Sequence, residues 1–160
     1  MFKGLVLGLH RVDSSIVFGG SFSIIRQGVK LGRYPHDLDV FIRDANYVGQ
    51  WKQFLIESGY HEVTCSNGYA RDAVLVMMND LGFKVEFYEI KPGTITVCDP
   101  EYKIAVDDEL ENPVRLVSLY DIIKWKLTYL EEGNDEQAAK CLRDIEAITH
   151  HVYASRVYKH

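Results

Sequence analysis

A short apolar strand that runs directly into two glycines restricts the fold more than any other part of the sequence. Residues 15–18 are rich in β-branched and apolar side chains and stop at Gly19 and Gly20. Residues 21–30 then have helical periodicity, and residues 38–42 form a second apolar run. The opening is therefore predicted to be strand, glycine turn, helix and strand.

The remainder of the chain continues with alternating strands and helices. A helix follows the second strand, and residues 73–78 and 83–90 alternate in polarity on either side of the turn sequence "NDLG". These two runs predict an antiparallel hairpin. A short strand at residues 114–117 and two helices, which begin near Ser118 and Asp135, complete the order. The sequence predicts an α+β fold with a mixed β-sheet and helices packed on it.

Each predicted helix carries apolar residues at helical spacing, so each has one buried face. The predicted inward residues are Phe2, Leu5, Val6, Leu9 and Val12; Phe22, Ile25 and Val29; Tyr47, Val48, Trp51, Phe54 and Leu55; Leu119, Ile122, Ile123, Leu127 and Leu130; and Ala138, Cys141, Leu142, Ile145 and Ile148. The final stretch, "THHVYASRVYKH", is interpreted as a frayed polar tail.

Length and composition favour one compact unit. With 160 residues, 47% of them hydrophobic, the chain is long enough for a real core. Residues 1–112, with an N-terminal helix, are expected to form the larger part, and residues 113–160 a strand and two helices packed on it. A net charge of -5 argues against binding a long nucleic-acid backbone through bulk charge. The three cysteines are scattered, which predicts a reducing cytoplasm, and the N-terminal apolar run is too short for a membrane span.

Asp37 and Asp39 lie two residues apart on the second strand, so both side chains point to one face while Leu38 and Val40 point into the core. Two carboxylates this close repel each other unless a cation lies between them. Carboxylate oxygens suit a hard divalent ion, and together with phosphates they suit magnesium. The alternative for an isolated Asp-x-Asp pattern is the polar edge of a half-exposed strand.

The glycine turn adds a second indication of phosphate chemistry. Gly19 and Gly20 let backbone amides approach a ligand, and Ser21 lies at the start of the next helix, where free N–H groups and the dipole favour a phosphate. The alternative is an ordinary strand-to-helix turn in which Ser21 is the N-cap.

Glu86 is the predicted third carboxylate. In the run "FKVEFYEI", Lys84, Glu86 and Tyr88 share one face, while Val85 and Phe87 belong to the core. Glu89, at the end of the strand, is predicted to be solvated. An exposed strand residue beside Lys84 remains the alternative for Glu86.

These residues resemble the nucleotidyltransferase superfamily, in which an apolar strand, a Gly-Ser helix start, an Asp-x-Asp strand and a third acid on a later strand recur. Here the corresponding segments are "VFGGSF", "HDLDVFI" and "KVEFY". The opening is similar to the palm of CCA-adding enzymes, and the segment from "LVSLYDIIKWKL" onward resembles AbiEii-like and minimal nucleotidyltransferases. The resemblance implies the polymerase-β-like palm fold, with residues 1–112 as the palm and residues 113–160 packed on it.

The resemblance also implies an activity: metal-dependent transfer of a nucleoside monophosphate from an NTP to a hydroxyl of a tRNA, a protein or a small molecule. Asp37, Asp39 and Glu86 would be the catalytic and metal residues for a site of two Mg²⁺ ions, and Gly19, Gly20 and Ser21 would bind the nucleotide. A catalytically inactive nucleotide-binding or antitoxin-like relative is the alternative, and an oligomer is possible.

Lys126 is the last candidate for nucleotide binding, and its position is unusual without any resemblance. It lies near the middle of the apolar stripe of its helix, where an ammonium group is costly unless it meets an anion. The possible solutions are escape to the surface, a carboxylate such as Asp144, or the triphosphate. Arg33 and Tyr34 could stack on a base or belong to a surface loop.

Overall fold

The computed structural model describes residues 2–64, 72–90, 114–132 and 134–157. The elements are α1 (Phe2–Val12), β1 (Val17–Phe18), α2 (Gly20–Arg26), β2 (Asp37–Ile42), the 3-10 helix η1 (Ala45–Tyr47), α3 (Val48–Glu57), β3 (Tyr60–Glu62), β4 (Leu75–Asn79), β5 (Lys84–Glu89), β6 (Arg115–Leu116), α4 (Leu119–Glu132) and α5 (Asp135–Val157). The predicted boundary between residues 112 and 113 lies outside the described residues, so the division into two parts stays a prediction.

The strands form one mixed sheet in the order β3-β4-β5-β2-β1-β6. At its centre β2 pairs with β5 in parallel, and β4 and β5 form the predicted antiparallel hairpin. β1 runs antiparallel to β2 and parallel to β6, which brings the strand before α4 into the same sheet. The mixed sheet with packed helices confirms the predicted α+β class.

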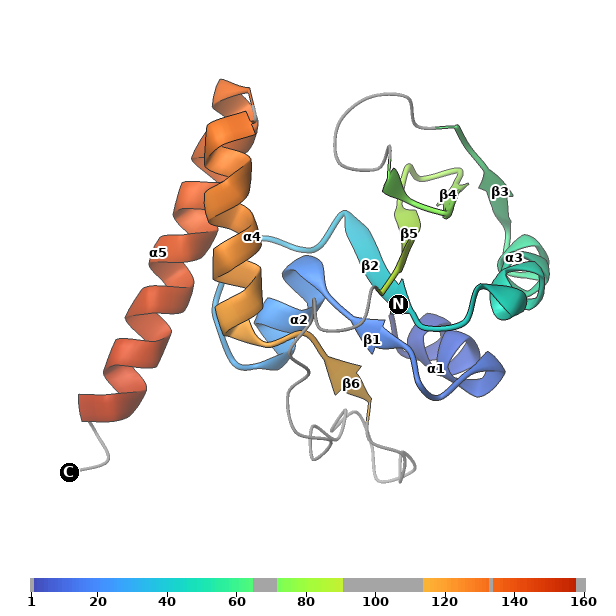
Figure 1. Cartoon of the computed structure of the whole chain (residues 1–160), viewed down its shortest axis with the longest axis horizontal. Coiled ribbons are helices and arrows are strands. Elements are labelled where there is room, and N and C mark those ends of the chain that lie inside the picture. The colour runs from blue at the N-terminus through green and yellow to red at the C-terminus, as the bar shows by residue number, and fades with distance from the viewer. Residues whose placement is uncertain (1, 65–71, 91–113, 133, 158–160) are drawn as a thin grey trace.

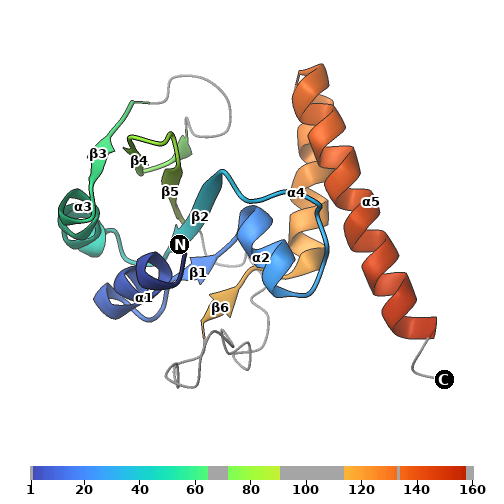
Figure 2. The ribbon, with the colours of Figure 1, turned by 180° about the vertical axis from the view of Figure 1, so that it is seen from behind.

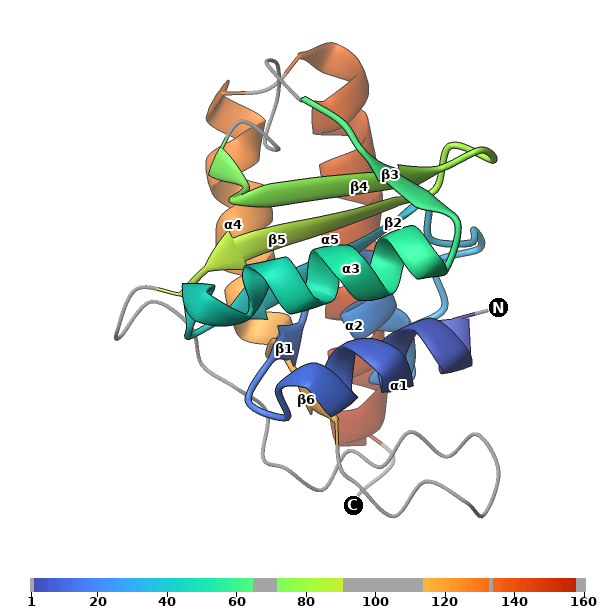
Figure 3. The same ribbon diagram turned by 90° about the vertical axis from the view of Figure 1, so that its right-hand side faces the viewer.

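Helices cover both faces of the sheet. In Figures 1 and 2, α1 and α3 lie on one side, while α2, α4 and α5 lie on the other. Figure 3 looks onto the side of α1 and α3, with the sheet behind them. The two helices that follow β6 therefore pack beside each other over one face.

Two hydrophobic clusters match these two layers. On the first side Val6 of α1 and Trp51 of α3 are fully buried against the sheet, where Phe87 of β5 contacts the Trp51 ring. On the second side Ile122 of α4 and Ile148 of α5 belong to a smaller cluster. The sheet thus has one tightly filled face and one face whose helices leave room for a cavity.

The structure corrects two details of α2. The helix ends at Arg26 rather than at Lys30, because Gly28 has a φ of 89°, in the left-handed region where a helix cannot continue. Its buried face contains Phe22 and Ile24, whereas Ile25 is only partly buried.

The last two helices differ more from prediction. Leu127 of α4 and Leu142 of α5 were predicted to face inward but are 50% and 49% exposed. Residues 122, 125, 126 and 129 of α4 form the face toward the sheet, which turns Leu127 outward. The predicted frayed tail is also wrong for residues 149–157, because α5 continues to Val157, whereas residues 158–160 lie outside the described residues. Within the described residues no helix is long and apolar enough to cross a membrane.

Candidate functional site

A cavity of about 400 Å³ lies between the sheet and the α4–α5 pair, within the range of pockets that hold small ligands. Its lining residues are Gly20, Ser21, Asp37, Asp39, Phe41, Lys84, Glu86, Tyr88, Ile122, Trp125, Lys126, Tyr129, Gln137, Lys140 and Cys141. All the predicted site residues except Gly19 line it. The fold therefore brings together predicted site residues from four elements, which are α2, β2, β5 and α4.

The floor of the cavity consists of three pairs of residues on the parallel strands β2 and β5. The register places Asp37 opposite Lys84, Asp39 opposite Glu86, and Phe41 opposite Tyr88. Because side chains alternate along a strand, all six share the face toward the cavity, while the intervening apolar residues belong to the opposite core. The sequence predicted the face that Asp37, Asp39 and Glu86 share but not the aromatic pair.

The glycine turn lies directly against Asp39. Gly20 has a φ of 56°, and a Cβ built on it would overlap the Asp39 carboxylate, so both the backbone conformation and the space require glycine. The Gly19 N–H donates to the Asp39 carbonyl at 2.9 Å. Gly19, not Ser21, is the N-cap of α2; Ser21 is buried in the first turn. The first turn of α2, where N–H groups lack intrahelical partners, therefore borders the carboxylates.

The three carboxylates interact strongly with one another. Burial is the main cause that raises the pKa of Asp39 to about 8, and the negative charges of Asp37 and Glu86 raise it further. Lys126 and Lys140 act in the opposite direction. Without a cation, the cavity thus favours the protonated form of Asp39.

This raised pKa predicts how stability depends on pH. Asp39 has a lower pKa in the unfolded chain than in the fold, so the stability it contributes is complete below about pH 4 and is lost as pH rises through 8. Without divalent ions, we expect the Tm of Asp39→Asn to rise relative to the Tm of the wild type as pH increases from 5 to 8, because only the wild type loses this contribution. A difference that stays constant over this range would contradict the pKa assignment.

Glu86 is held by its neighbour on the same face. It is 8% exposed, and the Tyr88 hydroxyl donates to its Oε2 at 2.6 Å. Burial, followed by the charges of Asp39 and Glu86, raises the pKa of Tyr88, so the phenol keeps its proton and remains a donor. Glu89 is exposed, as predicted. One oxygen of Glu86 is therefore fixed by Tyr88.

The donor set has the chemistry of a divalent-cation site but is not arranged as a complete one. Asp37, Asp39 and Glu86 offer carboxylate oxygens, which hard cations prefer. Among the residues that the structure describes, however, no three His, Cys, Asp or Glu side chains stand in an arrangement that could hold a metal ion. The charges of Asp37 and Glu86 oppose ionisation of Asp39 when no cation is bound, and the Tyr88 hydroxyl is bonded to one Glu86 oxygen. Their role as metal ligands stays a prediction.

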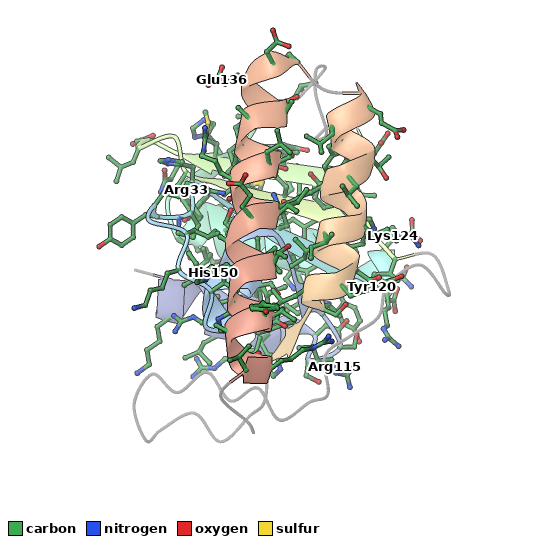
Figure 4. The ribbon with its side chains drawn as sticks, turned by 90° about the vertical axis from the view of Figure 1, so that its left-hand side faces the viewer. Arg33, Arg115, Tyr120, Lys124, Glu136 and His150 are labelled. Atoms are coloured by element: carbon green, nitrogen blue, oxygen red, sulfur yellow. The ribbon has the colours of Figure 1, made fainter. Side chains whose placement is uncertain are left out.

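Lys126 contacts a carboxylate, which was one of its three predicted solutions. Its Nζ lies 2.8 Å from Oδ2 of Asp144, whose side chain is 3% exposed. Arg33 binds the same carboxylate with one guanidinium nitrogen, at 2.9 and 2.7 Å from the two oxygens. In Figure 4 Arg33 lies beside α5, in front of the sheet. Two cations therefore share one buried carboxylate, and Lys126 also lines the cavity.

This shared carboxylate predicts unequal effects of two substitutions. Lys126→Met leaves Asp144 paired with Arg33, so we expect the free energy of unfolding to change by less than about 1 kcal/mol. Asp144→Asn leaves two partly buried cations without their counterion and is expected to cost about 1–3 kcal/mol. Urea unfolding of both variants measures this, and a larger cost for Lys126→Met than for Asp144→Asn would contradict the shared pairing.

Solved structures that share this fold include two of ANT(2″)-Ia. The crystal structure of ANT(2″)-Ia in complex with adenylyl-2″-tobramycin has a TM-score of 0.60 and 15% identity, with 98% of this chain and 94% of that chain covered. The solution structure of the antibiotic-resistance factor ANT(2″)-Ia has a TM-score of 0.54 and 17% identity, with 100% and 98% covered. No family model matches the chain, and no curated protein matches it in sequence. The chain thus shares the fold of ANT(2″)-Ia along nearly its whole length.

Proposed function

We propose that this protein is a metal-dependent nucleotidyltransferase, which transfers a nucleoside monophosphate from an NTP to a hydroxyl group and releases pyrophosphate. One observation carries the proposal: Asp39 and Glu86 lie opposite each other on parallel strands, and the Gly20-Ser21 turn borders Asp39 within the same cavity. A phosphate site, a carboxylate pair and a third carboxylate are the groups that this chemistry needs.

The nucleotide would be held by the turn and by the carboxylates together. The N–H groups of Gly20 and Ser21, with the Ser21 hydroxyl, would bind the β- and γ-phosphates, because the first turn of a helix offers free donors to an anion. Asp37, Asp39 and Glu86 would bind one or two Mg²⁺ ions, which neutralise charge on the pyrophosphate leaving group. Asp39 has to lose its proton when such a cation binds.

Glu86 would be the general base. The acceptor hydroxyl forms a new bond to the α-phosphorus, the bond between the α-phosphorus and the bridging oxygen breaks, and pyrophosphate leaves with that electron pair. The hydroxyl proton passes to Glu86. Because Tyr88 donates to Oε2, the other oxygen of Glu86 is the one available to accept the proton.

Lys126 would support the phosphates from the opposite wall of the cavity. Its positive charge lowers the pKa of Asp39, so the ammonium group interacts electrostatically with the carboxylates that border the phosphate site. Arg33 could keep Asp144 paired when Lys126 turns toward a phosphate. A small-molecule acceptor is the first class to test, since the ANT(2″)-Ia structure contains an adenylylated small molecule; tRNA and proteins follow.

Two measurements test the function. In a thermal-shift assay, each NTP together with Mg²⁺ should raise the Tm. The same NTP without the metal should raise the Tm by a smaller amount. Pyrophosphate release should then appear when aminocyclitols, tRNA or total protein are offered as acceptors. Nucleotide binding without release for any acceptor would favour the inactive, regulatory relative. Absence of any NTP effect on the Tm would contradict the proposal.

A further inference from the structure

The end of the cavity beyond the carboxylates is aromatic. Phe41 and Tyr88 form the third pair of the β2–β5 floor, and their rings stack with centroids 5.5 Å apart. The Trp125 ring of α4 lies 5.2 Å from that of Phe41. These three side chains, which we call the aromatic wall, all line the cavity.

The aromatic wall does not belong to the filled part of the core. Phe41 and Trp125 are only partly buried at the edge of the second cluster, in contrast to Trp51, which is completely buried on the other side of the sheet. Trp125 is presented by the same face of α4 as Lys126 and Tyr129, both of which line the cavity. Large aromatic surface that faces a cavity beside charged groups is typical of a ligand site.

The glycine turn lies against both the carboxylates and the aromatic wall, so one ligand can reach both. A Cβ on Gly19 would overlap the Phe41 ring, just as a Cβ on Gly20 would overlap Asp39. The carboxylate pair and the aromatic pair are two residues apart along the strands, about 7 Å. A nucleotide carries both an anion for the turn and a planar ring that can reach the next pair of residues.

We propose that the nucleobase of the bound NTP stacks on the aromatic wall, with Trp125 as its main contact. This inference rests on the proposed function. The base is favoured over the acceptor because it is covalently tied to the phosphates, and the turn that would bind them touches Phe41. Stacking tolerates any base, because every base has a π-face. We therefore expect ATP and GTP to bind with similar affinity.

Fluorescence can test this stacking without catalysis. The chain has two tryptophans, and Trp51 is fully buried with its indole N–H bonded to the Leu9 carbonyl at 3.1 Å. A change in emission on titration with adenosine, which has no phosphates and needs no metal, would therefore report Trp125. We expect adenosine and ATP both to quench the emission, and inorganic triphosphate to leave it unchanged.

Three variants locate the contact. Trp125→Leu should weaken adenosine binding, measured by calorimetry, by about 5- to 150-fold, the range that stacking of a base on an aromatic ring is worth. Trp125→Phe keeps a π-face and should recover part of the affinity. Tyr120→Leu is the matched control: Tyr120 is 74% exposed on the same helix and lies on its side away from α5 (Figure 4), so affinity should not change.

The outcomes separate this inference from the proposed function. ATP turnover with unchanged emission, and with equal adenosine affinity in the wild type and Trp125→Leu, would overturn the stacking site and leave the transferase standing. A Trp125→Leu variant that raises the KM of the acceptor alone would also overturn it. Quenching by adenosine that depends on Trp125, in a protein without transfer activity, would support the base site and contradict the transferase.

Discussion

Asp39→Asn and Asp37→Asn are each expected to reduce nucleotidyl transfer by about 1,000-fold or more, while the protein stays folded. A carboxylate that holds a catalytic divalent ion contributes several kcal/mol to stabilising the transition state, which corresponds to a loss of this size. The Tm without divalent ions should stay level or rise. Asp37→Asn removes a charge that raises the pKa of Asp39, and Asp39→Asn removes a carboxyl group whose ionised form is opposed by burial. Initial rates of pyrophosphate release and thermal denaturation measure the two effects.

Asp80→Asn is the control for these variants. Asp80 is an exposed aspartate in the turn between β4 and β5, outside the cavity, so its loss should affect neither rate nor Tm. The assignment of Asp37 and Asp39 as metal ligands would be wrong if either asparagine variant kept nearly full activity, or if both variants were grossly unfolded.

Glu86→Gln is expected to reduce kcat by at least about 100-fold, the lower range for loss of a general base. Glutamine keeps the shape of the side chain and can still accept the Tyr88 hydrogen bond, so NTP affinity should change much less. Single-turnover rates and NTP titrations separate the two quantities.

Glu89→Gln provides the matched comparison on the same strand. Glu89 is exposed at the end of β5 and lies on the opposite face from Glu86, so its substitution should be nearly silent. If Glu89→Gln were severe and Glu86→Gln mild, the general base would lie on the other face of β5, and the proposed mechanism would fail.

Local periodicity was sufficient to predict the carboxylate face. The alternation of Asp37, Leu38 and Asp39 decides which side chains point away from the core whatever the neighbouring strands are. The same rule places Phe41 on the face of Asp39, and Tyr88 on that of Glu86. Alternation therefore predicts both aromatic side chains on the carboxylate face, but the pairing of Phe41 with Tyr88 depends on the register between β2 and β5, which periodicity within one strand does not determine.

Contacts between distant segments were harder to predict. Lys126 was recognised because a charge on an apolar helix stripe needs an anion, and Asp144 occupies a similar buried position between Cys141 and Ile148 of α5. Arg33, 111 residues before Asp144, sits in a loop whose sequence has no period, so nothing local indicated its partner. The outward turn of Leu127 likewise follows from where α4 docks, which periodicity alone does not determine.

The most direct test of the proposed function is to follow which phosphorus of the NTP is transferred. The protein is incubated with Mg²⁺, an acceptor that supports pyrophosphate release, and ATP labelled either at the α- or at the γ-phosphorus. Nucleotidyl transfer predicts that the α-label becomes attached to the acceptor while the γ-label appears only in pyrophosphate. Transfer of the γ-label to the acceptor, or hydrolysis of ATP that leaves the acceptor free of both labels, would contradict the proposed function.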